Sequence, residues 1–241
     1  MCLLALVPHP ESAARPGVRY ARGMGQFRGA FDRELEAIEA KVIELLGMVV
    51  EDLAVATAAL LGSRGETAGV LAGRERLTDA LYVEIEDLAA RAILLQAPVA
   101  VDLRFLLTVL RVVPELERSH DLVVELAFRA SRIHGGDLPP KVAQAAGQMA
   151  DLAAVMWWQA ADAWSERDRS AAAGLGRPRA EMDELHALLT AEIGAAGMPV
   201  GTSMEMTLAA RDYQRLGAHA LNIARRVAYL AGPSGGIAAR R

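Results

Sequence analysis

The stretch ELERSHD at residues 115–121 decides the fold, because a counterpart, YQRLGAH at residues 213–219, follows about one hundred residues later. A proline-containing turn precedes each stretch, APV at residues 97–99 and MPV at residues 198–200. The order of these features is the same in both halves, and their spacing is similar. The chain therefore contains an internal duplication.

The length of the repeat indicates what has been duplicated. A charged stretch opens each copy, RERLTD at residues 74–79 and RAEMD at residues 179–183, and the matched residues Asp79 and Asp183 are 104 positions apart. A period near one hundred exceeds any solenoid unit. We therefore expect two copies of a helical module, of which the first keeps its acidic residues and the second has lost most of them.

The composition favours helices and a soluble, cytoplasmic protein. The 241 residues are 53% hydrophobic and only 5% aromatic, which is typical of helices packed through small and aliphatic side chains. The net charge is −4 and no block of sequence is basic, so no nucleic-acid partner is expected. The single cysteine, Cys2, fits a reducing compartment. No uncharged run reaches the ~20 residues that a membrane span needs.

Hydrophobic spacing of three to four residues predicts an all-α fold, a tandem pair of three-helix bundles with six long helices. Residues 1–23 contain prolines and no helical period, and we interpret them as a disordered leader. The first bundle is expected at residues 24–134 and the second at 140–232. A Gly/Pro-rich linker at 135–139 would join them, and 233–241 would form a flexible tail.

Two pairs of acidic residues are candidates for a metal site. Glu75 and Asp79 are four residues apart, as are Glu117 and Asp121, and such pairs share one helix face. Asp79 lies 19 residues before Pro98 and Glu117 lies 19 after it, so the pairs would meet on an antiparallel hairpin. Four carboxylates would suit a hard or borderline cation. The alternative is a solvated face paired with nearby arginines.

A second interpretation involves His120. Glu117 and His120 form Glu-x-x-His, a ligand pair of di-iron helical bundles, and Asp183 with His186 is its nearest counterpart in the second half. A carboxylate-bridged metal enzyme is therefore an alternative, although that architecture needs a second complete pair and two more glutamates. The sequence has no phosphate loop, dinucleotide fingerprint or nucleophile elbow. We assign no catalytic residue and do not expect an enzyme.

The positions of the three tryptophans predict which of them are buried in the core. Trp157 and Trp158 are adjacent on a predicted helix, so one can face the core while the other faces elsewhere. Trp164 lies about two turns further along the same helix. We expect two of the three in the core, and an outward tryptophan can also mark a partner surface.

The chain resembles the PhoU family of phosphate-uptake regulatory proteins over residues 27–232. PVAVDLR at residues 98–104 is similar to the family's P-x-A-S-D-L-R, and ELERSHD at 115–121 is similar to its E-L-E-R-I-G-D. MDELH at 182–186 is similar to the M-D-x-L-H of actinobacterial members. YQRLGAHALNIA at 213–224 is similar to Y-E-R-x-x-D-H-A-x-N-I-A. The chain is thus identified as a divergent, actinobacterial-type member.

The resemblance implies a cytoplasmic homodimer that regulates phosphate uptake and represses phosphate-starvation signalling. Such a protein would be an adaptor between a phosphate ABC transporter and a sensor histidine kinase, and it would associate peripherally with membrane complexes through them. Acidic motifs bind metal ions in the family. By position, Glu117 and Asp121 would be the main ligands, and Glu75 and Asp79 would form the partner motif. The resemblance leaves the identity of the metal open among iron, manganese, zinc and magnesium.

The chain departs from the family pattern mainly in its second half. Gln214 stands for an expected glutamate, Ala218 for an aspartate and Arg179 for an aspartate. An arginine repels a cation and the other two changes remove anionic ligands, so metal is expected in the first bundle only. His120 and Asp183 are secondary ligand candidates. A helical scaffold that binds no metal is the third interpretation.

Overall fold

The computed structural model describes residues 17–62, 67–133 and 138–231. It has six long helices, α1 (Gly17–Leu60), α2 (Thr67–Gln96), α3 (Ala100–Arg132), α4 (Pro140–Glu166), α6 (Gly176–Ala195) and α7 (Val200–Leu230). A four-residue helix, α5 (Ala171–Gly174), lies between α4 and α6. These residues contain no strand. The all-α prediction is confirmed.

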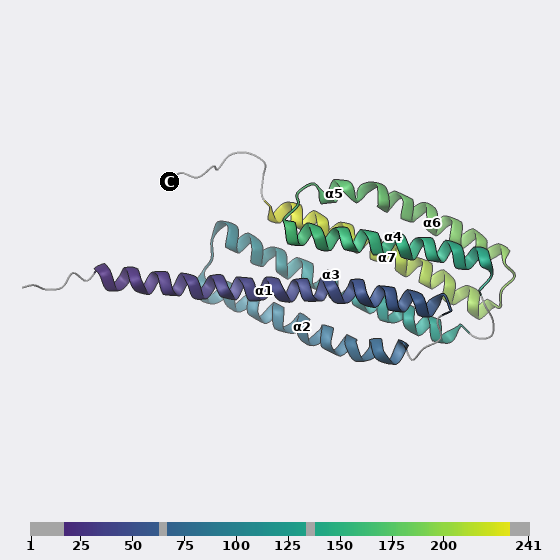
Figure 1. Cartoon of the computed structure of the whole chain (residues 1–241), viewed down its shortest axis with the longest axis horizontal. Coiled ribbons are helices and arrows are strands. Elements are labelled where there is room, and N and C mark those ends of the chain that lie inside the picture. The colour runs from purple at the N-terminus through teal and green to yellow at the C-terminus, as the bar shows by residue number, and fades with distance from the viewer. Residues whose placement is uncertain (1–16, 63–66, 134–137, 232–241) are drawn as a thin grey trace, which may run out of the picture.

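The helices form two three-helix bundles packed side by side (Figure 1). Helices α1, α2 and α3 contact one another in the first bundle, and α4, α6 and α7 do so in the second. The bundles meet where α1 contacts α4 and α3 contacts α7, whereas α2 and α6 lie on opposite outer sides. The predicted tandem pair of bundles is confirmed, and the two bundles share one hydrophobic core.

The helix ends lie near the expected positions, with one difference at the start. Helix α1 begins at Gly17, inside the range 1–23 that we interpreted as a leader. Residues 1–16 and the tail at 233–241 lie outside the described residues, as does the expected linker at 135–139 apart from its last two residues. The proposed division of the chain into domains therefore stays a prediction.

The same backbone feature precedes the last long helix of each bundle. Ala97 follows α2 with φ 44°, and Gly197 follows α6 with φ 63°. This left-handed conformation stops a helix and suits glycine better than alanine. The two hairpins that contain these residues, α2–α3 and α6–α7, turn at opposite ends of the molecule (Figure 1).

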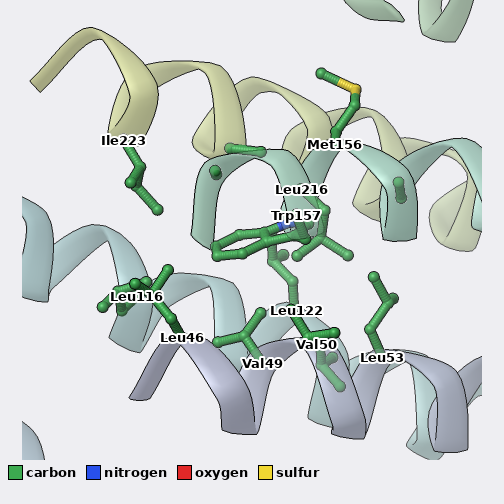
Figure 2. Packing of buried hydrophobic residues seen from close by; sticks show 14 of the residues in the cluster. Leu46, Val49, Val50, Leu53, Leu116, Leu122, Met156, Trp157, Leu216 and Ile223 are labelled. Carbon is green, nitrogen blue, oxygen red and sulfur yellow. The ribbon is translucent and has the colours of Figure 1, made fainter. Parts of the chain in front are cut away.

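Trp157 lies at the junction of the two bundles (Figure 2). It projects from α4 among Val49 and Leu53 of α1, Leu122 of α3 and Leu216 of α7. Trp157 and Trp164 are fully buried, whereas Trp158 is 58% exposed. The expectation of two core tryptophans is confirmed, and each bundle is completed by side chains of the other.

Polar contacts also join the two bundles. Arg129 of α3 donates to Asp212 of α7 at 2.8 Å and to Glu205 at 3.2 Å. The hydroxyls of Thr57 and Tyr213 lie 2.9 Å apart, between α1 and α7. Because these groups are largely withdrawn from water, each depends on its partner in the other half.

Candidate metal centre and its counterpart

Three of the four predicted ligands form an acidic cluster between α2 and α3. Asp79 lies on α2, and Glu117 and Asp121 lie one turn apart on α3. Burial raises the pKa of Glu117, and the charges of Asp121, Asp79 and Glu86 raise it further. Burial likewise raises the pKa of Asp121, followed by the charge of Asp79. The charge of Asp79 on α2 thus acts on both acids of α3, and the role of these residues as metal ligands stays a prediction.

The donor set of this cluster suits a hard cation, but it is open in geometry. Within the described ranges, no three His, Cys, Asp or Glu side chains converge closely enough to hold a metal ion. Magnesium in proteins commonly binds through one or two carboxylates and keeps several waters. A cation bound here would therefore have to keep several waters in its coordination shell.

Within the described residues no hydrogen bond or ion pair joins Glu75 or His120 to this cluster, although the charge of His120 opposes the rise in the pKa of Asp121. Glu75 is not among the charges that shift the pKa of Glu117 or Asp121. His120 is buried, and its Nε2 lies 2.9 Å from Oδ2 of Asp52. Its Nδ1 is also buried and has no hydrogen-bond partner. The ring therefore contacts the interior of the first bundle through Asp52.

Asp52 is the site residue that sequence reasoning missed. It is fully buried on α1, where it accepts a hydrogen bond from Arg74 of α2 and contacts His120 of α3. A single carboxylate on α1 thereby contacts side chains of both other helices of the first bundle. The available signal was its spacing, because Asp52 follows Val49 by three residues and so lies on the apolar stripe of α1.

The counterpart of the acidic cluster in the second bundle carries its own positive charge. Arg179 forms an ion pair with Asp183 one turn away on α6, and the side-chain amide of Gln214 on α7 donates to the same oxygen at 2.6 Å. Although burial acts in the opposite direction, these two hydrogen bonds lower the pKa of Asp183. The guanidinium of Arg179 satisfies the one carboxylate that remains, so Asp183 is not an open ligand here.

The raised pKa values give the acidic cluster a defined effect on stability. A carboxyl group whose pKa is higher in the folded state favours folding below its unfolded pKa, and this contribution is lost as the pH rises through the folded pKa. At pH 7 the charged cluster therefore opposes folding.

We expect Asp121→Asn to raise the free energy of unfolding of chelator-treated protein at pH 7 by a few tenths of a kcal/mol. The effect is small because the cluster is partly hydrated. Urea titrations of variant and wild type across pH 3–8 check this. The difference should vanish at the acid end, and a variant that is less stable at pH 7 would contradict the assignment.

The fold and these sites define a class: a duplicated six-helix protein with an acidic cluster in one bundle and a self-neutralised counterpart in the other. The family model for the PhoU domain matches the chain twice, at residues 42–130 and 147–227. The chain belongs to the PhoU family.

Relatives and solved structures agree with this assignment. The chain is 30% identical over 200 residues to a protein of Caulobacter vibrioides, across 81% of this chain and 86% of the relative. It is 27% identical over 206 residues to one of Rhizobium meliloti, across 84% and 87%. Both are named phosphate-specific transport system accessory protein PhoU homologs.

Two crystal structures share the fold. PhoU of Pseudomonas aeruginosa has a TM-score of 0.78 at 23% identity, across 83% of this chain and 98% of that one. The phosphate transport system regulatory protein PhoU of Streptococcus pneumoniae has a TM-score of 0.77 at 22% identity, across 84% and 97%. Among the described helices of the present chain, none is long and apolar enough to cross a membrane.

Proposed function

We propose that this protein regulates phosphate uptake and phosphate-starvation signalling as a non-enzymatic, metal-binding adaptor. The observation that carries the proposal is the PhoU-domain match in both halves, which covers the acidic cluster and its counterpart. Its curated relatives are named as accessory proteins of the phosphate-specific transport system. The present chain would serve the same system.

As an adaptor, the protein would bind two partners at the membrane. One partner is the cytoplasmic side of a phosphate ABC transporter, and the other is a sensor histidine kinase. The protein would work in the cytoplasm as a homodimer and reach the membrane through these partners. The shared core supports this role, because two bundles packed on one core would hold their outer helices α2 and α6 on opposite sides for two partners.

The acidic cluster would bind one divalent cation. Burial and neighbouring acidic charges, among them that of Asp79, raise the pKa values of Glu117 and Asp121, and a cation would relieve the repulsion between these carboxylates. Water would complete the coordination shell, as is usual for magnesium. The cation would thereby stabilise the α2–α3 hairpin of the first bundle. Asp183 in the second bundle would stay paired with Arg179 instead.

A phosphate-starvation reporter in the source organism tests the proposed function. Deletion of the gene should switch the reporter on in phosphate-rich medium, and wild-type protein should switch it off again. Glu117→Ala/Asp121→Ala should fail to do so at equal protein level. Glu181→Ala/Glu184→Ala is the matched control, since these exposed acids of α6 form no ion pair within the described residues. A reporter that stays off in the deletion strain would refute the regulatory role.

A further inference from the structure

Arginines that are dispersed in the sequence gather on one face of the structure. Arg104, Arg111 and Arg118 follow one another at intervals of seven residues on α3, which places them on one side of the helix about 10 Å apart. On α7, Arg211, Arg215 and Arg226 recur at helical spacing, with Arg225 beside them. All except the partly exposed Arg104 are exposed.

Helices α3 and α7 run antiparallel and in contact, which joins the two rows (Figure 1). Ser119 of α3 lies against His219 of α7, whereas Arg129, further along α3, contacts Asp212, earlier on α7. At the other end, Arg104 and Arg111 lie over the ring of Tyr229, at 5.9 and 5.8 Å from its centroid. We call this surface the arginine face; its members are Arg104, Arg111, Arg118, Arg211, Arg215, Arg225, Arg226 and Tyr229.

The charges of the arginine face are not neutralised internally. Within residues 17–62, 67–133 and 138–231, none of its seven guanidinium groups forms an ion pair with a carboxylate. Acidic neighbours border it as well: Glu117 beside Arg118, Asp212 near Arg215, and Glu115, whose Oε2 lies 3.8 Å from Nδ1 of His219. A basic face of this kind is a local feature on a chain of net charge −4, and it would attract an external anion.

The outer side of α7 continues from the arginine face into an apolar end. Val200, Met204 and Leu208 precede Arg211 at spacings of four, four and three residues, and they are 76%, 60% and 41% exposed. They line a shallow hollow of about 390 Å³ together with Met198, Ser203 and Thr207. Exposed apolar side chains beside unpaired arginines are the pattern of surfaces that lie on anionic membranes.

We propose that the arginine face and the apolar end of α7 form a docking surface for an anionic lipid bilayer. The arginines would contact lipid phosphates, Tyr229 would lie at headgroup level, and Val200, Met204 and Leu208 would enter the interface. An acidic protein segment could satisfy the arginines. It would not account for three exposed apolar side chains on the same side of α7, and the lipid surface accounts for both. This contact goes beyond the proposed function, because it needs neither the transporter nor the kinase.

Sedimentation with vesicles tests the proposal with purified, full-length protein. We expect binding to vesicles that contain phosphatidylglycerol, little binding to phosphatidylcholine alone, and release as salt is raised. Arg111→Glu/Arg118→Glu/Arg215→Glu should weaken binding by more than roughly tenfold. The matched control is Arg33→Glu/Arg169→Glu/Arg177→Glu, which changes the net charge equally at exposed arginines outside the arginine face. It should bind nearly as the wild type does.

A second variant separates lipid from other polyanions. Val200→Ser/Met204→Ser/Leu208→Ser should weaken vesicle binding while leaving binding to soluble polyglutamate unchanged. Circular dichroism confirms that each variant is folded. Three results would overturn the proposal: no binding of wild type to phosphatidylglycerol vesicles, equal loss in the two arginine variants, or full vesicle binding by the serine variant. The last would indicate an acidic protein or other soluble polyanion as the ligand.

Discussion

Replacing Asp52 with alanine is expected to lower the free energy of unfolding by about 3–5 kcal/mol. The carboxylate is fully buried and bonds to Arg74 on one side and to His120 on the other. Its removal leaves the His120 ring with no hydrogen-bond partner on either nitrogen, since Nδ1 already has none. A buried polar group without a partner carries its full cost of desolvation. Chemical denaturation with a two-state fit measures the loss.

Two companion variants keep this prediction specific. Asp52→Asn preserves the volume and an acceptor oxygen, so it should lose less stability than the alanine variant. Asp87→Ala removes an exposed carboxylate whose ion pair with Arg91 spans 3.6 Å, and surface pairs contribute below about 1 kcal/mol. If Asp52→Ala lowered the free energy of unfolding no more than Asp87→Ala does, the buried contacts of Asp52 would not be what joins the three helices of the first bundle.

The second large effect is expected from Trp157→Ala, at about 3–5 kcal/mol. Trp157 is fully buried where α4 meets α1, α3 and α7 (Figure 2). Truncation would leave a cavity in the core that the two bundles share, so both should lose stability together. Thermal unfolding followed by circular dichroism measures the change.

The neighbouring tryptophan is a matched control for this variant. Trp158 has the same chemistry on the same helix but is 58% exposed, and substitutions at such sites usually stay within about 0.5 kcal/mol. Trp157→Phe should lie between the two, because it keeps most of the ring while removing an indole N–H that has no partner. Equal losses at Trp157 and Trp158 would contradict the placement of the shared core.

Most of the fold could be predicted from the sequence because helices obey local rules. The apolar spacing of α1 and the proline turns at Pro98 and Pro199 placed the long helices. The beginning of α1 could not be placed this way, because residues 17–23 show no apolar stripe and are nevertheless helical. The packing of α1 on α4 and of α3 on α7 also lay beyond local rules, since it depends on contacts between distant residues.

The candidate site was predictable only in part. Helical spacing brought Asp79, Glu117 and Asp121 together, because they share a hairpin. The same spacing made His120 a secondary candidate for this cluster. The His120 ring is instead hydrogen-bonded to Asp52, which is 68 residues earlier in the chain. Glu-x-x-His spacing cannot distinguish an outward ring from an inward one when its partner is on another helix.

The arginine face illustrates the same limit for surfaces. The sequence has no basic block here, because six residues separate each of Arg104, Arg111 and Arg118 from the next. The arginines of α7 join them only through the antiparallel contact between α3 and α7. Charge patterns that arise from two helices become visible when the pairing of those helices is known.

We propose that the first bundle has a cation site, whereas the second carries its own counter-charge in Arg179. Elemental analysis of untagged protein, purified without chelator, tests it beside Glu117→Ala/Asp121→Ala and Asp183→Ala. We predict about one equivalent of a divalent metal in the wild type and in Asp183→Ala, and loss of that metal in the double variant. Wild-type protein that is folded but free of metal, or a double variant that keeps its metal, would contradict the account.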